Sequence, residues 1–407
     1  MERKKKRNAA RIKFVQVLPS WEEHVRGVEV LKQHFPPPPF WDGTVDLAQI
    51  SSFYRAVLRL FKNIVFLGTG EVILVLQNLF REYSPGFGGN QAFYFCSDFD
   101  MALLERLVKV FPLEETVGVI LARRVEEFKL LTLSFAFPWK KVLLGSTHGI
   151  MAEVARELFL PFYPVEDGYH YFWHRSVLLY LPLFCFGVPL EDLDRGFQEG
   201  YPLFQKEAMI LSLLLAREKE KGWKEVCFLV DNQFLFSLFQ SFLPLLEKSC
   251  QGVTGVDFGV RDLFSFWDTH RDSPSWREKA TSTLFVVIRS GEAKQGLLFQ
   301  RPHFLQRKLF FEEWNLLDRA SFGQFHHAEC LALLSVLREA EASFVEIQYL
   351  DTGPETVGQI VAFLHQWVCY NAWLRGLDLL GDPPVLGFES LVRSFLKRKN
   401  QSMEVRK

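Results

Sequence analysis

The chain has 407 residues, enough for two α/β domains that each bury a core of their own. Its 47 Lys and Arg residues nearly balance 48 Asp and Glu residues, so net charge gives no argument for nucleic acid or an anionic membrane as partner. No apolar run reaches the ~20 residues of a membrane span, and no apolar segment follows the basic N-terminus to form a secretory signal.

Short apolar strands alternate with helices in the first half of the chain. A proline-rich stretch at residues 36–39 ends an expected N-terminal arm, residues 1–48. Strands, each followed by a helical segment, are predicted at residues 63–67, 93–96, 117–121 and 142–144. This alternation indicates a parallel sheet covered on both faces. The sequence therefore predicts an α/β domain over residues 49–165.

A second α/β set follows a mostly helical connection at residues 166–200. It is expected over residues 201–350, with helices and strands predicted at 207–220, 226–230, 283–287, 328–341 and 344–348. Residues 351–407 are expected to form long C-terminal helices. The pattern alone indicates a two-domain α/β protein and leaves its function open.

The six cysteines are widely scattered, and none belongs to a CxxC pair. In a chain of this size, that spacing is typical of reduced, buried thiols in a cytoplasmic protein. It also argues against a zinc site, so no metal is expected.

Several blocks of the sequence follow one another along the chain: residues 66–70, 97–100, 145–147, the central stretch 165–179 and residues 351–358. Their order resembles that of the motifs in bacterial phosphoglucose isomerases. The chain thus resembles that family over roughly residues 50–395, through the order of its blocks. The resemblance implies two sugar isomerase (SIS) domains with parallel sheets flanked by helices, usually in a homodimer. It also implies interconversion of glucose 6-phosphate and fructose 6-phosphate, with no cofactor.

The first phosphate-binding turn of that family is partly kept. Members place Gly-Thr-Gly-Gly-Ser after the first strand, where backbone N–H groups at a helix N-terminus bind the anion. Gly68, Thr69 and Gly70 match this turn, but Glu71 and Val72 replace its last two residues. A carboxylate suits the start of a helix, so we interpret Glu71 as a capping acid that competes with phosphate.

Two further loops correspond to phosphate-binding loops of the family. The hydroxyls of its Ser-Lys-Ser-Gly-Gly-Thr loop are absent from residues 119–127. Arg123 and Arg124 are the best remaining candidates there for bidentate phosphate contacts, with a solvated charge pair as the alternative. Thr147, next to Ser146, is a candidate phosphate ligand, with a plain helix N-cap as the alternative.

Aldose–ketose isomerisation needs a ring-opening acid, a carboxylate base and a cation that stabilises the enediolate. Alignment on Ser176 places His174 at the position of the family's enediolate-stabilising Arg, with Arg175 one residue later. Asp257 lies near the family's Glu base, with a turn Asp as the alternative. His326, beside His327, lies near the ring-opening His, with a structural role as the alternative.

Two replacements remove further residues that the family uses. Phe264 stands where short members have a His, and Glu389 falls where a catalytic Lys is expected, which reverses the local charge. Two hypotheses follow: an isomerase that retains turnover through displaced residues, or a non-catalytic SIS-fold protein that binds a sugar phosphate or only a protein partner. A kinase or dehydrogenase built on residues 68–70 is disfavoured because no Lys-Ser/Thr ending and no GxGxxG spacing follows.

Overall fold

The structure is a computed structural model that describes residues 10–15, 28, 45–84, 90–97, 100–123, 126–165, 172–216, 222–250, 256–270, 275–292 and 321–377. The chain forms two compact units. The described residues from 45 to 190 make up the first, here called the β2 unit after the first strand of its sheet. The described residues 10–15, 28 and 191–377 make up the second, the β7 unit. Residues 10–15 pair in antiparallel fashion with residues 344–349 of this unit. Apart from these, residue 28 and residues 45–48, the expected N-terminal arm lies outside the described residues.

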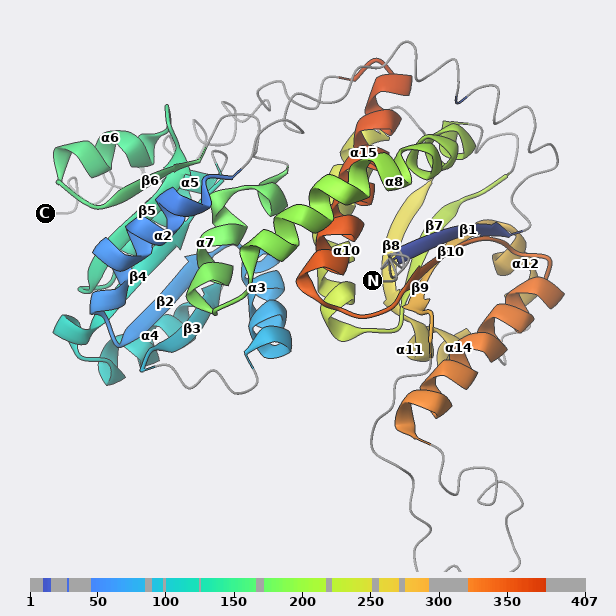
Figure 1. The fold of residues 1–407 in the computed structure, drawn as a ribbon, viewed down its shortest axis with the longest axis horizontal. Helices are drawn as coiled ribbons and strands as arrows, with labels where there is room; N and C mark the ends of the chain where they lie inside the picture. Colours follow the sequence, from blue (N-terminus) through green and yellow to red (C-terminus); the bar gives the residue numbers. More distant parts are fainter. Residues whose placement is uncertain are drawn as a thin grey trace, which may run out of the picture. The chain divides into compact units, whose positions relative to one another are not determined.

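The β2 unit is built on a five-stranded sheet in which every pairing is parallel (Figure 1). The strands lie in the order β3 (Ala92–Ser97), β2 (Asn63–Gly68), β4 (Thr116–Leu121), β5 (Lys140–Ser146) and β6 (Phe162–Val165). The helices are α2 (Leu47–Ala56), α3 (Gly70–Tyr83), α4 (Met101–Val110), α5 (Glu127–Ser134), α6 (Ile150–Glu157) and α7 (Val177–Cys185), with short 3-10 turns at Leu58–Leu60, Leu113–Glu115 and Trp173–Arg175.

Alternating side chains of β2 cover the two faces of this sheet, as the pleat requires. Val65 and Leu67 pack into a core that includes residues of α4, α5 and α6. Phe66 faces the other way and packs on Phe186, which follows α7, with ring centroids 5.8 Å apart. Phe80, Phe93 and Phe95 join the same aromatic cluster. Part of the chain's phenylalanine content is therefore core packing.

The β7 unit repeats the arrangement with one change. Its sheet has the order β1 (Ala10–Val15), β10 (Ser343–Tyr349), β9 (Thr283–Ser290), β7 (Glu225–Val230) and β8 (Asp257–Asp262), and only β1 is antiparallel to its neighbour. The helices are α8 (Leu190–Ala216), α10 (Gln233–Ser249), α11 (Leu263–His270), α12 (Trp276–Thr281), α14 (Phe322–Glu339) and α15 (Pro354–Leu374). Residues of α11, α12 and α14 cover one face of the sheet, and α10 and α15 pack on Phe228 of the other.

Glycines let α8 and α15 approach at backbone distance. A Cβ added to Gly196 of α8 would overlap the carbonyl oxygen of Glu355, and one added to Gly358 of α15 would overlap the carbonyl oxygen of Leu193. Helix α15 is buried along most of its length. The two helices therefore pack against each other at backbone contact, and α15 packs on the sheet through Trp367 and Phe228.

The strand order predicts where each unit would bind a ligand. In both sheets the first of the parallel strands, β2 or β7, lies between the second and the third, so the connections leave it in opposite directions. Ligands of such sheets bind outside the carboxyl ends of the strands at this switch point. Those ends lead to Gly68–Gly70 and Arg123 in the β2 unit, and to Asp231 and Ser290 in the β7 unit.

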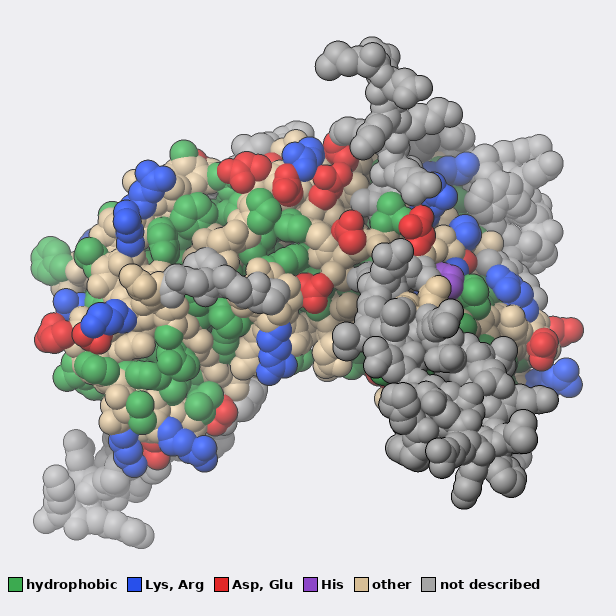
Figure 2. Space-filling view, turned by 60° about the horizontal axis from the view of Figure 1, so that its bottom comes forward, with side chains coloured by type: hydrophobic (Ala, Val, Ile, Leu, Met, Phe, Trp, Pro, Cys, Tyr) green, Lys and Arg blue, Asp and Glu red, His purple; other side chains and the backbone are tan. Residues whose placement is uncertain are grey.

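Neither sign of charge dominates the described part of the face in Figure 2. Acidic and basic side chains are both spread over the described part of the face drawn in Figure 2, in line with the balanced composition. All six cysteines are buried thiols, which confirms that expectation from the sequence. None of the helices in the described part of the chain is sufficiently long and apolar to cross a membrane.

Candidate functional site

The turn after β2 has the backbone of an anion-binding loop. Thr69 is the N-cap of α3 and has an extended backbone conformation, with φ −67° and ψ 157°. Its hydroxyl is buried and makes no hydrogen bond to the described residues. Glu71 lies in the first turn of α3. The helix therefore begins with backbone donors and an acidic side chain of its own.

Arg123 is held by two carboxylates of the same unit. Its guanidinium donates to Glu71 Oε1 at 3.4 Å and, from Nε, to Glu126 Oε1 at 2.8 Å. Nη2 forms ion pairs with both acids, and 17% of the Arg123 side chain is exposed. Trp173 Nε1 donates to Glu71 Oε1 at 3.4 Å. Arg123 is thus part of an internal network and is not presented to a ligand as a free cation.

Burial and charge act in opposite directions on this network. Burial raises the pKa of Glu71, and Arg123 only partly offsets that rise. For Arg123, burial alone would lower the pKa, but Glu126 and Glu71 outweigh it and raise the pKa above its ordinary value. Two acids share one guanidinium, so the local field does not favour a phosphate dianion.

The backbone around the loop after β5 binds the carboxylate of Glu127. Glu127, at the start of α5, is 1% exposed and accepts hydrogen bonds from the backbone N–H of Ser146 at 2.5 Å and of Met151 at 3.1 Å. A Cβ at Gly149 would overlap Oε2 of this carboxylate, so only glycine leaves room for it. Glu127 thus takes one backbone donor at the end of β5 and one in the first turn of α6, the position in which such a helix end binds an external anion. Thr147 is exposed.

His174 and Arg175, the candidates for the enediolate-stabilising cation, are both buried in the β2 unit. They belong to the 3-10 turn Trp173–Arg175 that leads into α7. Arg175 is 1% exposed and donates to the hydroxyl of Tyr180 at 3.1 Å. His174 is 2% exposed and stacks on Trp173, with ring centroids 4.1 Å apart. Arg124 and Glu389 lie outside the described residues.

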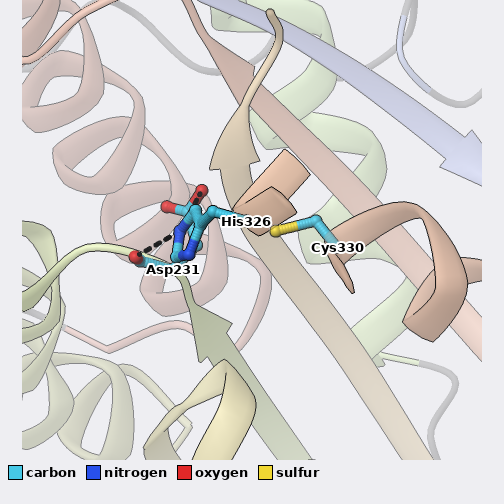
Figure 3. Close-up of side chains that lie close together, drawn as sticks. All are labelled: Asp231, His326 and Cys330. Carbon is cyan, nitrogen blue, oxygen red and sulfur yellow. Dashed lines mark hydrogen bonds and ion pairs between the residues drawn. The ribbon is translucent and has the colours of Figure 1, made fainter. Parts of the chain in front are cut away.

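A second group of polar side chains gathers at the carboxyl ends of β7, β9 and β10. Asp231, 8% exposed, accepts from the hydroxyl of Tyr349 at 2.6 Å and from the backbone N–H of Ser290 at 2.8 Å. His326 Nε2 of α14 lies 3.2 Å from the carbonyl oxygen of Asp231 and 3.8 Å from its Oδ2 (Figure 3). These residues line a cavity of about 450 Å³.

Cys330 lies one helical turn beyond His326 and also lines this cavity. Burial raises the pKa of its thiol to about 12, and the negative charge of Asp231 adds to the rise. The thiol is therefore protonated at neutral pH and is a poor nucleophile as it stands.

Asp257 lies at the amino ends of the strands, whereas Asp231 and His326 lie at the carboxyl ends. It is the first residue of β8 and is exposed, whereas Asp262 at the carboxyl end caps α11 through the N–H of Ser265 at 2.8 Å. The six residues of β8 put Asp257 about 17 Å from the edge that carries His326. Phe264, the replacement for a family His, packs on His326 with ring centroids 4.5 Å apart. The structure brings His326 together with Asp231 and Phe264, and not with Asp257.

Sequence analysis did not select Asp231, although a signal for it exists. It follows directly on the apolar run Val226–Val230, as an acid at the carboxyl end of a predicted strand. Cys330 could also have been selected, because it lies four residues after His326 and residues four apart on a helix share a face.

Comparisons with known proteins support the fold. Neither a scan of protein-family models nor a search of curated proteins found a match. A hypothetical protein of Thermus thermophilus superposes with a TM-score of 0.75 at 16% identity, over 95% of this chain and 100% of that one. A glucose-6-phosphate isomerase from Chlamydia trachomatis has a TM-score of 0.60 at 14% identity, over 87% and 73%. The predicted fold class, with parallel sheets flanked by helices as in sugar-phosphate isomerases, is confirmed.

Proposed function

We propose that this chain keeps the phosphoglucose isomerase fold without interconverting glucose 6-phosphate and fructose 6-phosphate, and acts as a non-catalytic scaffold that binds a protein partner. The supporting observation is that carboxylates of the chain occupy the positions in which the family binds phosphate. Glu71 and Glu126 hold Arg123, and Glu127 takes the backbone donors after β5.

The argument is electrostatic. A phosphate brought to the turn after β2 would meet Glu71 and Glu126 at close range, and Arg123 would have to leave both acids to bind it. Like charges within a few ångströms repel by about 4 kcal/mol at an effective dielectric constant near 20. The sugar phosphate would therefore lose the anchor that positions C1 and C2 for proton transfer.

A coupled assay on the purified full-length chain tests the proposal. We expect no conversion of fructose 6-phosphate above the uncatalysed rate, and no thermal stabilisation by either sugar phosphate. Turnover that disappears in His326→Ala, with the fold intact by circular dichroism, would overturn it. His148→Ala is the matched control, because His148 is exposed in the β2 unit.

A residual isomerase is the second candidate, favoured by Asp231 and His326 at the cavity. There His326 would open the sugar ring and the Asp231 carboxylate would move a proton between C2 and C1. In that case Asp231→Asn and His326→Ala would each remove turnover. The expected homodimer and cytoplasmic location remain proposals, and light scattering in solution tests the first.

A further inference from the structure

Three side chains of different chemistry converge at the carboxyl end of β7. Asp231 follows the strand, and His326 and Cys330 extend from successive turns of α14, as Figure 3 shows. Each offers one potential ligand atom, a carboxylate oxygen, an imidazole nitrogen or a thiol sulfur, and these atoms all lie within 4.8 Å of one another. None of the requirements of aldose–ketose isomerisation explains the thiol.

We propose that Asp231, His326 and Cys330 form a binding site for a divalent transition-metal ion, with Zn²⁺ as the preferred occupant. A mixed set of oxygen, nitrogen and sulfur ligands is typical of zinc, whereas Mg²⁺ and Ca²⁺ prefer oxygen alone. Cys330 would bind as the thiolate, and its proton would leave to solvent as the metal–sulfur bond forms.

The distance between Asp231 and His326 requires only a small contraction. Two ligands about 2.05 Å from a tetrahedral zinc ion are roughly 3.3–3.4 Å apart. Asp231 Oδ2 and His326 Nε2 are 3.8 Å apart, a few tenths of an ångström more. The His326 side chain is 40% exposed and can rotate toward the acid, whose side chain is 1% exposed and stays in place.

Hydrogen bonds from neighbouring residues orient the Asp231 carboxylate. Tyr349 and Ser290 donate to the two oxygens of Asp231, at 2.6 and 2.8 Å, and orient it toward α14. The helix itself starts with a capping box, in which Ser321 and Gln324 satisfy each other's backbone N–H groups. Hydrogen bonds to a metal ligand, such as those from Tyr349 and Ser290 to Asp231, typically raise metal affinity by about 10- to 100-fold.

The surroundings suit a cation with an open coordination position. The cavity of about 450 Å³ beside the ligands has room for water or a small ligand as the fourth partner. Its described lining includes the acids Glu292 and Glu329 as well as His327, and no Lys or Arg. A site lined by carboxylates concentrates cations.

The full-length chain tests this proposal directly. After stripping with a chelator, it is titrated with Co²⁺, whose thiolate charge-transfer absorption reports a metal–sulfur bond, and then with Zn²⁺ as competitor. We expect one metal ion per chain, the thiolate band in the wild type, and its displacement by Zn²⁺.

Variants assign the ligands. Cys330→Ser should abolish the band, and Asp231→Asn and His326→Ala should each weaken binding by about tenfold or more. Cys227→Ala and His148→Ala are the controls: Cys227 is a buried cysteine of the same sheet, and His148 is an exposed histidine. Both should bind as the wild type does.

No thiolate band in the wild type would overturn the proposal, and this outcome does not depend on any variant folding. A band of full strength in Cys330→Ser would overturn it too. The sugar-phosphate assay is a separate readout, so a failure of metal binding would leave the conclusion on isomerase activity untouched.

Discussion

Removal of the Glu127 carboxylate should empty the helix N-terminus that follows β5. In the wild type this side chain accepts hydrogen bonds from the backbone N–H groups of Ser146 and Met151. A hydrogen bond to a charged group contributes about 1.5–3 kcal/mol, so loss of both in Glu127→Ala should cost about 3–6 kcal/mol. Natural domains are stable by only about 5–15 kcal/mol, so the effect is large.

Urea unfolding followed by circular dichroism measures this cost. Glu127→Gln keeps one acceptor oxygen but presents an amide N–H to the second backbone donor, so we expect an intermediate loss. Glu153→Ala, an exposed acid of α6, is the control and should change the stability by less than about 0.5 kcal/mol.

Inorganic phosphate should then stabilise the Glu127→Ala variant more than the wild type. If inorganic phosphate binds the vacated donors with a Kd near ~1 mM, a concentration of ~10 mM adds about 1.4 kcal/mol to the stability of Glu127→Ala. In the wild type the Glu127 carboxylate already occupies these donors. Phosphate should therefore stabilise the wild type no more than it stabilises the Glu153→Ala control. Equal stabilisation of wild type and Glu127→Ala would refute the reasoning, and so would a Glu127→Ala variant within about 1 kcal/mol of the wild type.

Three further predictions follow from buried groups and close contacts. Burial raises the pKa of the Glu71 carboxyl, so the wild type loses stability as the pH rises from the ordinary carboxyl pKa through the raised one. Glu71→Gln does not titrate, so its melting temperature should increase relative to that of the wild type over the same rise in pH. Gly196→Ala should destabilise by about 3 kcal/mol or more in urea unfolding because its Cβ overlaps Glu355, whereas Gly259→Ala, with its closest contact at 3.5 Å, should be mild. Arg289 pairs with Glu346 at 2.6 Å in the core, so Arg289→Ala should cost about 3–5 kcal/mol in the same assay.

The sequence predicted the central strands well and missed three edge strands. The cores of β2, β4, β7 and β9 are continuous apolar runs because both faces of the sheet are covered. β1, β6 and β8 each have a single neighbour. β8 begins and ends with Asp and contains no fully buried residue, and β6 has four residues including Pro164. Partial burial removes the apolar pattern on which strand prediction depends.

The candidate site was predictable where partners are close in sequence and not where the fold creates them. Arg123 and Glu126 are three residues apart, so the pair could have been inferred from the sequence. Glu71 is 52 residues from Arg123, and His326 is 95 residues from Asp231; only the parallel strand order brings each pair together. Arg123 therefore looked like a phosphate ligand in the sequence, whereas the structure gives it two carboxylate partners.

Charge at the two switch points links the proposals. In the β2 unit, Glu71 and Glu126 pair with Arg123, and Glu127 accepts hydrogen bonds from the backbone N–H groups of Ser146 and Met151. In the β7 unit, three carboxylates line the cavity beside His326. Both switch points, where sheets of this kind would bind a ligand, therefore carry acids in the described part of the chain. Acids disfavour a bound phosphate and favour a cation, so the proposed lack of sugar-phosphate binding and the proposed metal site rest on the same electrostatics.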